Sequence, residues 1–140
     1  MIQKRLAILA VGLCEEDHCV IRQVLSRSGR SLACTATIAE ATRFLERNLA
    51  PVILCESNLP DGSWRDLLEA AAIGRRPPNV IVTYRLADDH LWAEVLNLGG
   101  YDVLAKPFDG CELFRALSSA WRNWHYAELV QEEKAALAVG

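Results

Sequence analysis

The sequence predicts an α/β domain built on a doubly wound, parallel, five-stranded sheet. Short apolar segments, which are typical of buried strands, alternate with segments whose apolar residues recur at helical spacing. Five such pairs follow one another, an alternation typical of a parallel sheet with helices on both faces. About half of the 140 residues are apolar, so the chain can bury the core of one domain.

The five strands are predicted at residues 6–13, 31–37, 52–55, 80–83 and 101–105. A short acidic loop, residues 14–18, is expected after the first strand. Helices are expected near residues 20–25, 37–45, 64–72 and 88–98, and from about residue 109 onward. Thr37 with Glu40 is typical of a helix start, and Gly99 with Gly100 is typical of a helix end.

Composition argues against several classes of protein. A net charge of -3 and a pI near 5.6 give no basic surface for nucleic acid. The longest apolar run, residues 6–14, is too short to span a bilayer and lacks a secretory cleavage site, so we expect no membrane contact and a cytoplasmic protein. Five cysteines are an odd number without metal-binding spacing, and we expect them to be reduced core residues.

Polar side chains follow several of the predicted strands. Glu56 comes after the third strand, Thr83 ends the fourth, Lys106 and Pro107 follow the fifth, and acids at residues 15–17 follow the first. The carboxyl ends of parallel strands meet at one edge of a doubly wound sheet, so these groups should share a pocket. Carboxylates, a hydroxyl and an ammonium together suit a divalent cation and a phosphoryl group.

With these motifs in this order, the chain resembles the CheY-like receiver domains of bacterial two-component response regulators. The resemblance covers roughly residues 4–124, and its carriers are the segments VILCESNLPDG, VIVT and VLAKPF. It implies a flavodoxin-like fold and a phosphoacceptor position at residue 56. It also implies a cis peptide bond between Lys106 and Pro107.

The main departure from the family is Glu56, which stands where receivers carry the phosphorylated Asp. One extra methylene moves the carboxylate by about 1.5 Å, and in-line phosphoryl transfer tolerates such misplacement badly. We therefore expect a fixed negative charge that forms a direct ion pair with Lys106. The alternative is that Glu56 is simply solvated at the end of its strand.

Two further departures lie beside the pocket. Tyr84 follows Thr83 where the family has a small residue, and it could cover the phosphoryl position. Val103 takes the place of the family's switch aromatic; Tyr101, two residues earlier and hence expected on the same strand face, could replace that ring only in part.

The family's Mg²⁺ site is matched loosely, by Glu16, Asp17 and Glu56. We favour a metal-free acidic loop stabilised by the helix N-terminus that follows, and therefore no cofactor.

The last helix continues past the length that a five-stranded sheet covers. We assign residues 1–125 to the receiver-like domain and residues 126–140 to a helical or frayed extension. Receivers commonly associate through their fourth and fifth helices, and a homodimer is expected here through five residues: Leu91, Trp92, Val95, Trp121 and Trp124.

The favoured function is a stand-alone, atypical receiver, or pseudo-receiver. It would act by contact with a histidine kinase or a downstream regulator, without catalysis of its own. One alternative is a phosphorylatable receiver with another acceptor, such as a loop acid or Asp61, although Asp61 is more simply a turn residue. The other is a small flavodoxin-like ligand-binding protein or enzyme, but no glycine-rich phosphate loop or catalytic Ser/His/Asp set is present.

Overall fold

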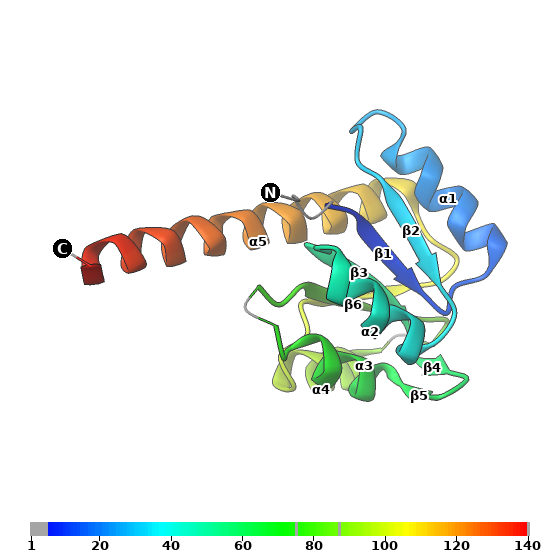
Figure 1. The fold of residues 1–140 in the computed structure, drawn as a ribbon. Helices are drawn as coiled ribbons and strands as arrows, with labels where there is room; N and C mark the ends of the chain where they lie inside the picture. Colours follow the sequence, from blue (N-terminus) through cyan, green and yellow to red (C-terminus); the bar gives the residue numbers. More distant parts are fainter. Residues whose placement is uncertain (1–5, 75, 87, 140) are drawn as a thin grey trace.

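The computed structural model describes residues 6–74, 76–86 and 88–139 and confirms the predicted fold class. Five parallel strands form one sheet in the order β2-β1-β3-β6-β7 (Figure 1). Their bounds are β1 Ile8–Val11, β2 Leu32–Thr35, β3 Val52–Glu56, β6 Asn79–Tyr84 and β7 Asp102–Ala105. The sheet therefore grows outward in both directions from β1 and β3, which places a topological switch point between these two strands.

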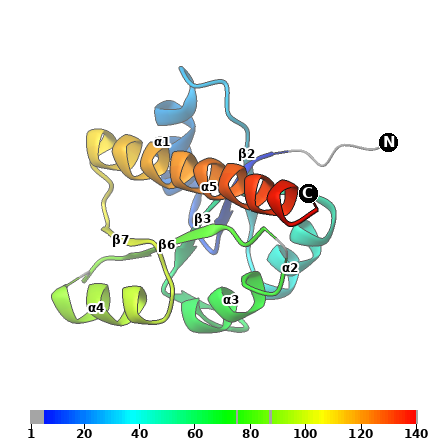
Figure 2. The ribbon, with the colours of Figure 1, turned by 90° about the vertical axis from the view of Figure 1, so that its left-hand side faces the viewer.

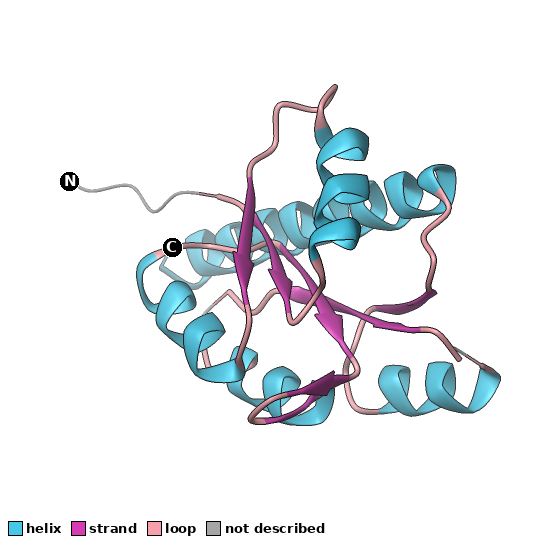
Figure 3. Ribbon diagram, turned by 90° about the vertical axis from the view of Figure 1, so that its right-hand side faces the viewer, coloured by secondary structure: helices cyan, strands magenta, loops and turns pink. Residues whose placement is uncertain are grey.

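Five helices cover the two faces of this sheet. They are α1 Glu15–Leu25, α2 Ile38–Arg47, α3 Trp64–Ala71, α4 Asp89–Asn97 and α5 Gly110–Val139. Helices α1 and α5 lie on one face, and α2, α3 and α4 lie on the other (Figures 2 and 3). Within the part of the chain that the structure describes, no helix combines the length and the apolar character that crossing a membrane requires.

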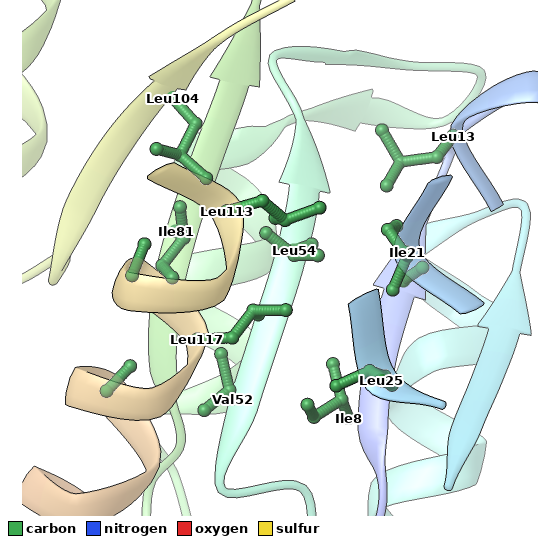
Figure 4. Close-up of a cluster of buried hydrophobic side chains, with 13 residues drawn as sticks. Ile8, Leu13, Ile21, Leu25, Val52, Leu54, Ile81, Leu104, Leu113 and Leu117 are labelled. Carbon is green, nitrogen blue, oxygen red and sulfur yellow. The ribbon is translucent and has the colours of Figure 1, made fainter. Parts of the chain in front are cut away.

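The strand residues alternate between two apolar clusters, one on each face. On one face, Ile81 and Leu54 lie beside Leu113 and Leu117 of α5, and Ile8 lies beside Leu25 of α1 (Figure 4). The intervening strand residues pack under α2, α3 and α4; they are Leu9, Val11, Ile53, Val80 and Val82. Because both faces are covered, the central strands are apolar throughout, which is why they appear in the sequence as unbroken apolar runs.

The helix ends follow the capping residues of the sequence. The hydroxyl of Thr37 accepts a hydrogen bond from the backbone N–H of Glu40 at 3.1 Å, as predicted. Asp88 caps α4 in the same way through the N–H of Leu91 at 2.9 Å. After α4, Gly99 adopts a φ of 97°, a conformation that favours glycine and turns the chain toward β7.

The prediction of an acidic loop after the first strand is wrong. Strand β1 ends at Val11 because Gly12, with a φ of 74°, turns the chain sharply beside Leu59. Residues 15–18 then form the first turn of α1 instead of a loop. Acidic side chains are favoured there because the unpaired N–H groups of a helix N-terminus carry partial positive charge.

The cysteine prediction is also corrected. None of the five cysteines forms a disulfide, but only Cys55 is buried. Burial raises the pKa of the Cys55 thiol, so it stays protonated and acts as a small core residue. The other four are exposed: Cys14, Cys19, Cys34 and Cys111.

Helix α5 runs without a break through residue 125 and projects beyond the sheet (Figure 1). Two residues near the start of β6 hold it where it leaves the domain. The Asn79 amide donates hydrogen bonds to the carbonyl of Ala120 at 2.8 Å and to the side chain of Asn123 at 3.0 Å. Arg76 stacks on the ring of Trp124, 4.3 Å from its centre, and forms an ion pair with Glu128.

Arg76→Ala is expected to loosen the extension of α5. The substitution removes the stacking on Trp124 and the ion pair with Glu128, interactions worth about 1–2 kcal/mol together. Amide hydrogen exchange over residues 125–139 should accelerate. Arg30→Ala is the matched control, because Arg30 stacks on Trp121, 4.5 Å from its ring, before the extension begins. Unchanged exchange in Arg76→Ala would show that this contact does not anchor the helix.

Candidate functional site

The predicted pocket residues meet at the carboxyl edge of the sheet. Glu56 is the last residue of β3 and lies opposite Thr83 in the parallel register of β3 and β6. Lys106 follows β7, and its backbone N–H donates to the carbonyl of Tyr84 at 3.3 Å. The peptide bond between Lys106 and Pro107 is cis, as expected.

The Lys106 ammonium forms a direct ion pair with the Glu56 carboxylate, as predicted. It also donates a hydrogen bond to Asp17 Oδ2 at 3.1 Å. The three side chains are largely withdrawn from solvent, with exposed fractions of 15% for Lys106, 17% for Glu56 and 13% for Asp17. One ammonium therefore bridges two carboxylates that come from α1 and β3, and the cluster keeps a net charge of -1.

The two carboxylates hold Lys106 in its charged form. Partial burial of the ammonium by itself lowers its pKa, but hydrogen bonds to Glu56 and Asp17 outweigh this effect. The pKa of Lys106 is consequently raised above its ordinary value. The ammonium of Lys106 is thus charged at neutral pH.

Thr83 lies fully buried beneath the ion pair. Its hydroxyl is 3.4 Å from the carbonyl oxygen of Cys55 and 3.5 Å from Glu56 Oε2. The other carboxylate oxygen of Glu56 accepts a hydrogen bond from the backbone N–H of Ser57 at 3.3 Å. Glu56 is therefore held by an ammonium, a hydroxyl and a backbone amide, so the alternative of a purely solvated carboxylate is excluded.

The aromatic positions beside the pocket are arranged differently from the expectation. Tyr84 is half-buried at the end of β6, next to Thr83. Val103 packs with the cluster under α2, α3 and α4, whereas Tyr101 packs with the opposite cluster and hydrogen bonds Ser119 of α5 at 2.6 Å. The prediction that Tyr101 and Val103 share a strand face is wrong, because Tyr101 precedes β7 and strand alternation does not extend to it.

The predicted Mg²⁺ ligands do not fit a divalent cation as they are arranged. Asp17 and Glu56 both direct an oxygen to the Lys106 ammonium, which lies where the two carboxylates converge. Glu16 is exposed on the first turn of α1. Among the described residues, no three His, Cys, Asp or Glu side chains gather in a way that could hold a metal ion.

The segment that follows Glu56 is more ordered than the predicted turn. Residues 58–63 form a small hairpin of β4 Asn58–Leu59 and β5 Gly62–Ser63. At its tip, the Asp61 carboxylate accepts hydrogen bonds from the backbone N–H groups of Ile38 at 2.9 Å and Ala39 at 3.1 Å. Asp61 is indeed a turn residue, but it also binds the N-terminus of α2 and so fixes the loop beside the pocket.

The sequence alone did not indicate this contact. Because of it, we expect the stability of the fold to depend on pH in acid. The backbone N–H of Ile38 is the main cause that lowers the pKa of Asp61. A lowered carboxyl pKa stabilises the fold above the ordinary Asp value of about 3.9, and this stability is lost as the pH falls through the lower, folded value. Asp61→Asn should therefore lower the melting temperature at pH 7 and accelerate amide exchange over residues 57–63.

The difference between Asp61→Asn and the wild type should shrink as the pH falls through the lowered, folded pKa of Asp61, where the wild-type carboxylate also becomes neutral. Glu69→Gln, an exposed change on α3, is the control and should alter neither quantity. A melting temperature that is equal for Asp61→Asn and the wild type at pH 7 would contradict the assigned role of Asp61.

The predicted interface residues are not equally accessible. Val95 is fully buried in the core and Trp124 is 6% exposed beneath Arg76, so neither can contribute a free surface. Trp121 is half-buried and covered in part by Arg30. Leu91 is half-buried, and Trp92 is 49% exposed. Helical periodicity alone could not separate the buried side of these helices from the exposed side.

Comparison with known proteins identifies the fold. No protein-family model matches the chain, and no curated protein matches it significantly in sequence. Among solved structures, a signal receiver domain from Vibrio parahaemolyticus superposes with a TM-score of 0.81 at 21% identity, over 91% of this chain and 98% of that one. The signal receiver domain of an HD domain-containing protein from Pseudomonas fluorescens Pf-5 gives 0.77 at 25% identity, over 91% and 95%.

A CheY-like response regulator receiver domain protein from Methanospirillum hungatei JF-1 gives a TM-score of 0.70 at 21% identity, over 89% of this chain and 99% of that one. The three structures are matched along almost their whole length, so the likeness covers the complete sheet and its helices.

Proposed function

We propose that this chain, which has the fold of response regulator receiver domains, is a pseudo-receiver that signals by protein contact without becoming phosphorylated. The ion pair between Glu56 and Lys106 is the observation that carries the proposal. It joins the residue at the phosphoacceptor position to the lysine of the VLAKPF motif, with the Thr83 hydroxyl beside them. A permanent carboxylate thus occupies the place where a receiver would gain and lose a phosphoryl group.

The surroundings of Glu56 support a fixed state. Its two oxygens are engaged by Lys106, Thr83 and the N–H of Ser57. The following hairpin is fastened to α2 through Asp61. In-line transfer needs a carboxylate oxygen placed at the attack position, and the contacts of Glu56 instead hold its Oε2 oxygen against Lys106 and Thr83.

The partner surface that we favour is formed by α4, β7 and α5. A shallow groove there is lined by Trp92 and Leu96 together with acids and arginines on its rim; the charged residues are Asp102, Asp109, Glu112, Arg115 and Arg122. A surface that carries both signs of charge around an exposed tryptophan can pair with a copy of itself across a two-fold axis. We propose that this face binds a second copy of the chain to form a homodimer, or binds a histidine kinase or downstream regulator in place of that copy.

Incubation of the full chain with acetyl phosphate and Mg²⁺, followed by intact mass measurement, tests the proposed function. The unmodified mass is the expected result, because the Glu56 carboxylate is bound and displaced from the attack position. A typical phosphorylatable receiver in the same reaction is the positive control. A stable phosphoryl adduct on Glu56, on Asp61 or on an acid of α1 would overturn the proposal in favour of a working receiver with an altered acceptor.

A further inference from the structure

We propose that the extension of α5 from one copy docks into a groove between α1 and α5 of a second copy, with Glu133 entering beside Arg27. This contact goes beyond the proposed pseudo-receiver function. The groove lies on the α1 side of α5, whereas the surface formed by α4, β7 and α5 lies on the other side, and Arg115 lines both. The contact rests on a mostly apolar strip with one acid, Glu133, at one end of the molecule and a groove with two arginines at the other; among the described residues these charges form no ion pair.

The extension strip consists of Tyr126, Val130, Glu133 and Leu137. Spacings of four, three and four residues place these side chains on one side of the helix. Trp124, which packs against the domain, precedes Tyr126 by two positions and therefore lies about 200° around the helix from it. The strip consequently faces away from its own domain, with Tyr126 67% exposed and Leu137 76% exposed.

The negative charge of Glu133 limits which surface can cover this strip. If two strips paired with each other, no residue of the second strip would supply a positive charge to the Glu133 carboxylate. The nearest cations would lie outside the strip, at Arg122 one turn before Tyr126 and at Lys134 beside Glu133. Burying a carboxylate without a positive partner costs more free energy than the apolar contacts of so short a strip return. The strip therefore fits an apolar surface that also supplies a cation.

The chain itself carries such a surface, which we call the arginine groove. Its lining includes Val24 in the last turn of α1, Arg27 in the turn that follows α1, and Cys111, Phe114 and Arg115 in the first turns of α5. The Phe114 side chain is 48% exposed and provides the apolar floor. Within the described residues, neither Arg27 nor Arg115 forms an ion pair, and neither does Glu133.

The strip and the groove of one molecule cannot meet. Glu133 follows Arg115 by 18 positions on one continuous helix, which separates them by about 27 Å along its axis. Figure 1 shows this helix running straight away from the end where α1 and α5 pack. The complementary charges can therefore pair only between copies, in a head-to-tail contact that adds further copies or closes into a ring.

Sedimentation velocity of the full chain over a wide concentration range at low salt tests the contact. We expect assemblies that grow past two copies and dissociate at high salt. Glu133→Lys and Arg27→Glu should each weaken association by roughly tenfold or more, because each sets two like charges together. An equimolar mixture of the two variants should associate again, since the strip of either variant then meets a groove of opposite charge on the other.

Arg43→Glu, an exposed charge reversal on α2, is the matched control and should associate like the wild type. Trp92→Ala separates this contact from a symmetric dimer, because it should leave growth past two copies intact. A wild-type chain that remains monomeric at every concentration would overturn the proposal. So would an assembly that Arg27→Glu leaves unchanged, or a mixture of the two charge variants that fails to recover association.

Discussion

Glu56→Asp is expected to gain a phosphoryl group from acetyl phosphate where the wild type gains none. Shortening the side chain by one methylene withdraws the carboxylate by about 1.5 Å, away from Lys106 and Thr83 and toward the position of the family's acceptor. Misplacement of a reacting group by about 1 Å can cost roughly a hundredfold in rate, so the variant should react at least that much faster. Intact mass measured against time gives the rate.

Glu56→Gln is the control for this gain, because it removes the negative charge and keeps the length of the side chain. It should remain unmodified. If Glu56→Asp also remains unmodified, the length of residue 56 is not what prevents phosphorylation, and the half-buried Tyr84 beside Thr83 becomes the next residue to change. If the wild type and Glu56→Asp react at equal rates, the extra methylene of Glu56 does not affect phosphoryl transfer.

Lys106→Met is expected to destabilise the fold by about 1–3 kcal/mol at pH 7, because it leaves Asp17 and Glu56 facing each other without a positive charge. Breaking a fully buried ion pair costs about 3–5 kcal/mol, and the loss here is smaller because water still reaches part of all three side chains. Urea unfolding measures the difference. Lys134→Met, on the exposed end of α5, should leave the free energy of unfolding unchanged.

The raised pKa of Lys106 fixes how this difference depends on pH in alkali. A raised lysine pKa stabilises the fold below the ordinary value of about 10.4, and that stability is lost as the pH rises through the higher, folded value. The wild type should therefore lose its advantage over Lys106→Met in strong alkali. A difference that stays constant from pH 7 into strong alkali would show that Lys106 contributes only packing.

The strands and the pocket were the parts of this structure that the sequence could predict. Apolar runs marked β1, β3 and β6 because both faces of the sheet are covered by helices. Glu56, Thr83 and Lys106 followed three of the parallel strands, and the parallel arrangement alone brings such positions together. The ion pair could be predicted because it needs only opposite charges at the carboxyl ends of β3 and β7, which lie on either side of β6 in the sheet.

The remaining features depend on contacts that no local pattern reveals. Asp61 binds the N-terminus of α2, more than twenty residues earlier in the chain, and nothing in a Pro-Asp-Gly turn indicates that partner. Tyr101 lies outside β7 by a single residue, which is enough to reverse its face. Val95 and Trp92 share α4, and only the packed structure shows that Val95 faces the core.

The proton–nitrogen correlation spectrum of the wild-type backbone, recorded before and after addition of beryllofluoride with Mg²⁺, tests most directly whether Glu56 holds the pocket in one state. The spectrum is expected to stay unchanged, because both carboxylate oxygens of Glu56 are already bound by Lys106, Thr83 and Ser57. Shifts that spread from residue 56 to α4 and β7 would contradict this account, because the pocket would then still switch as a working receiver does.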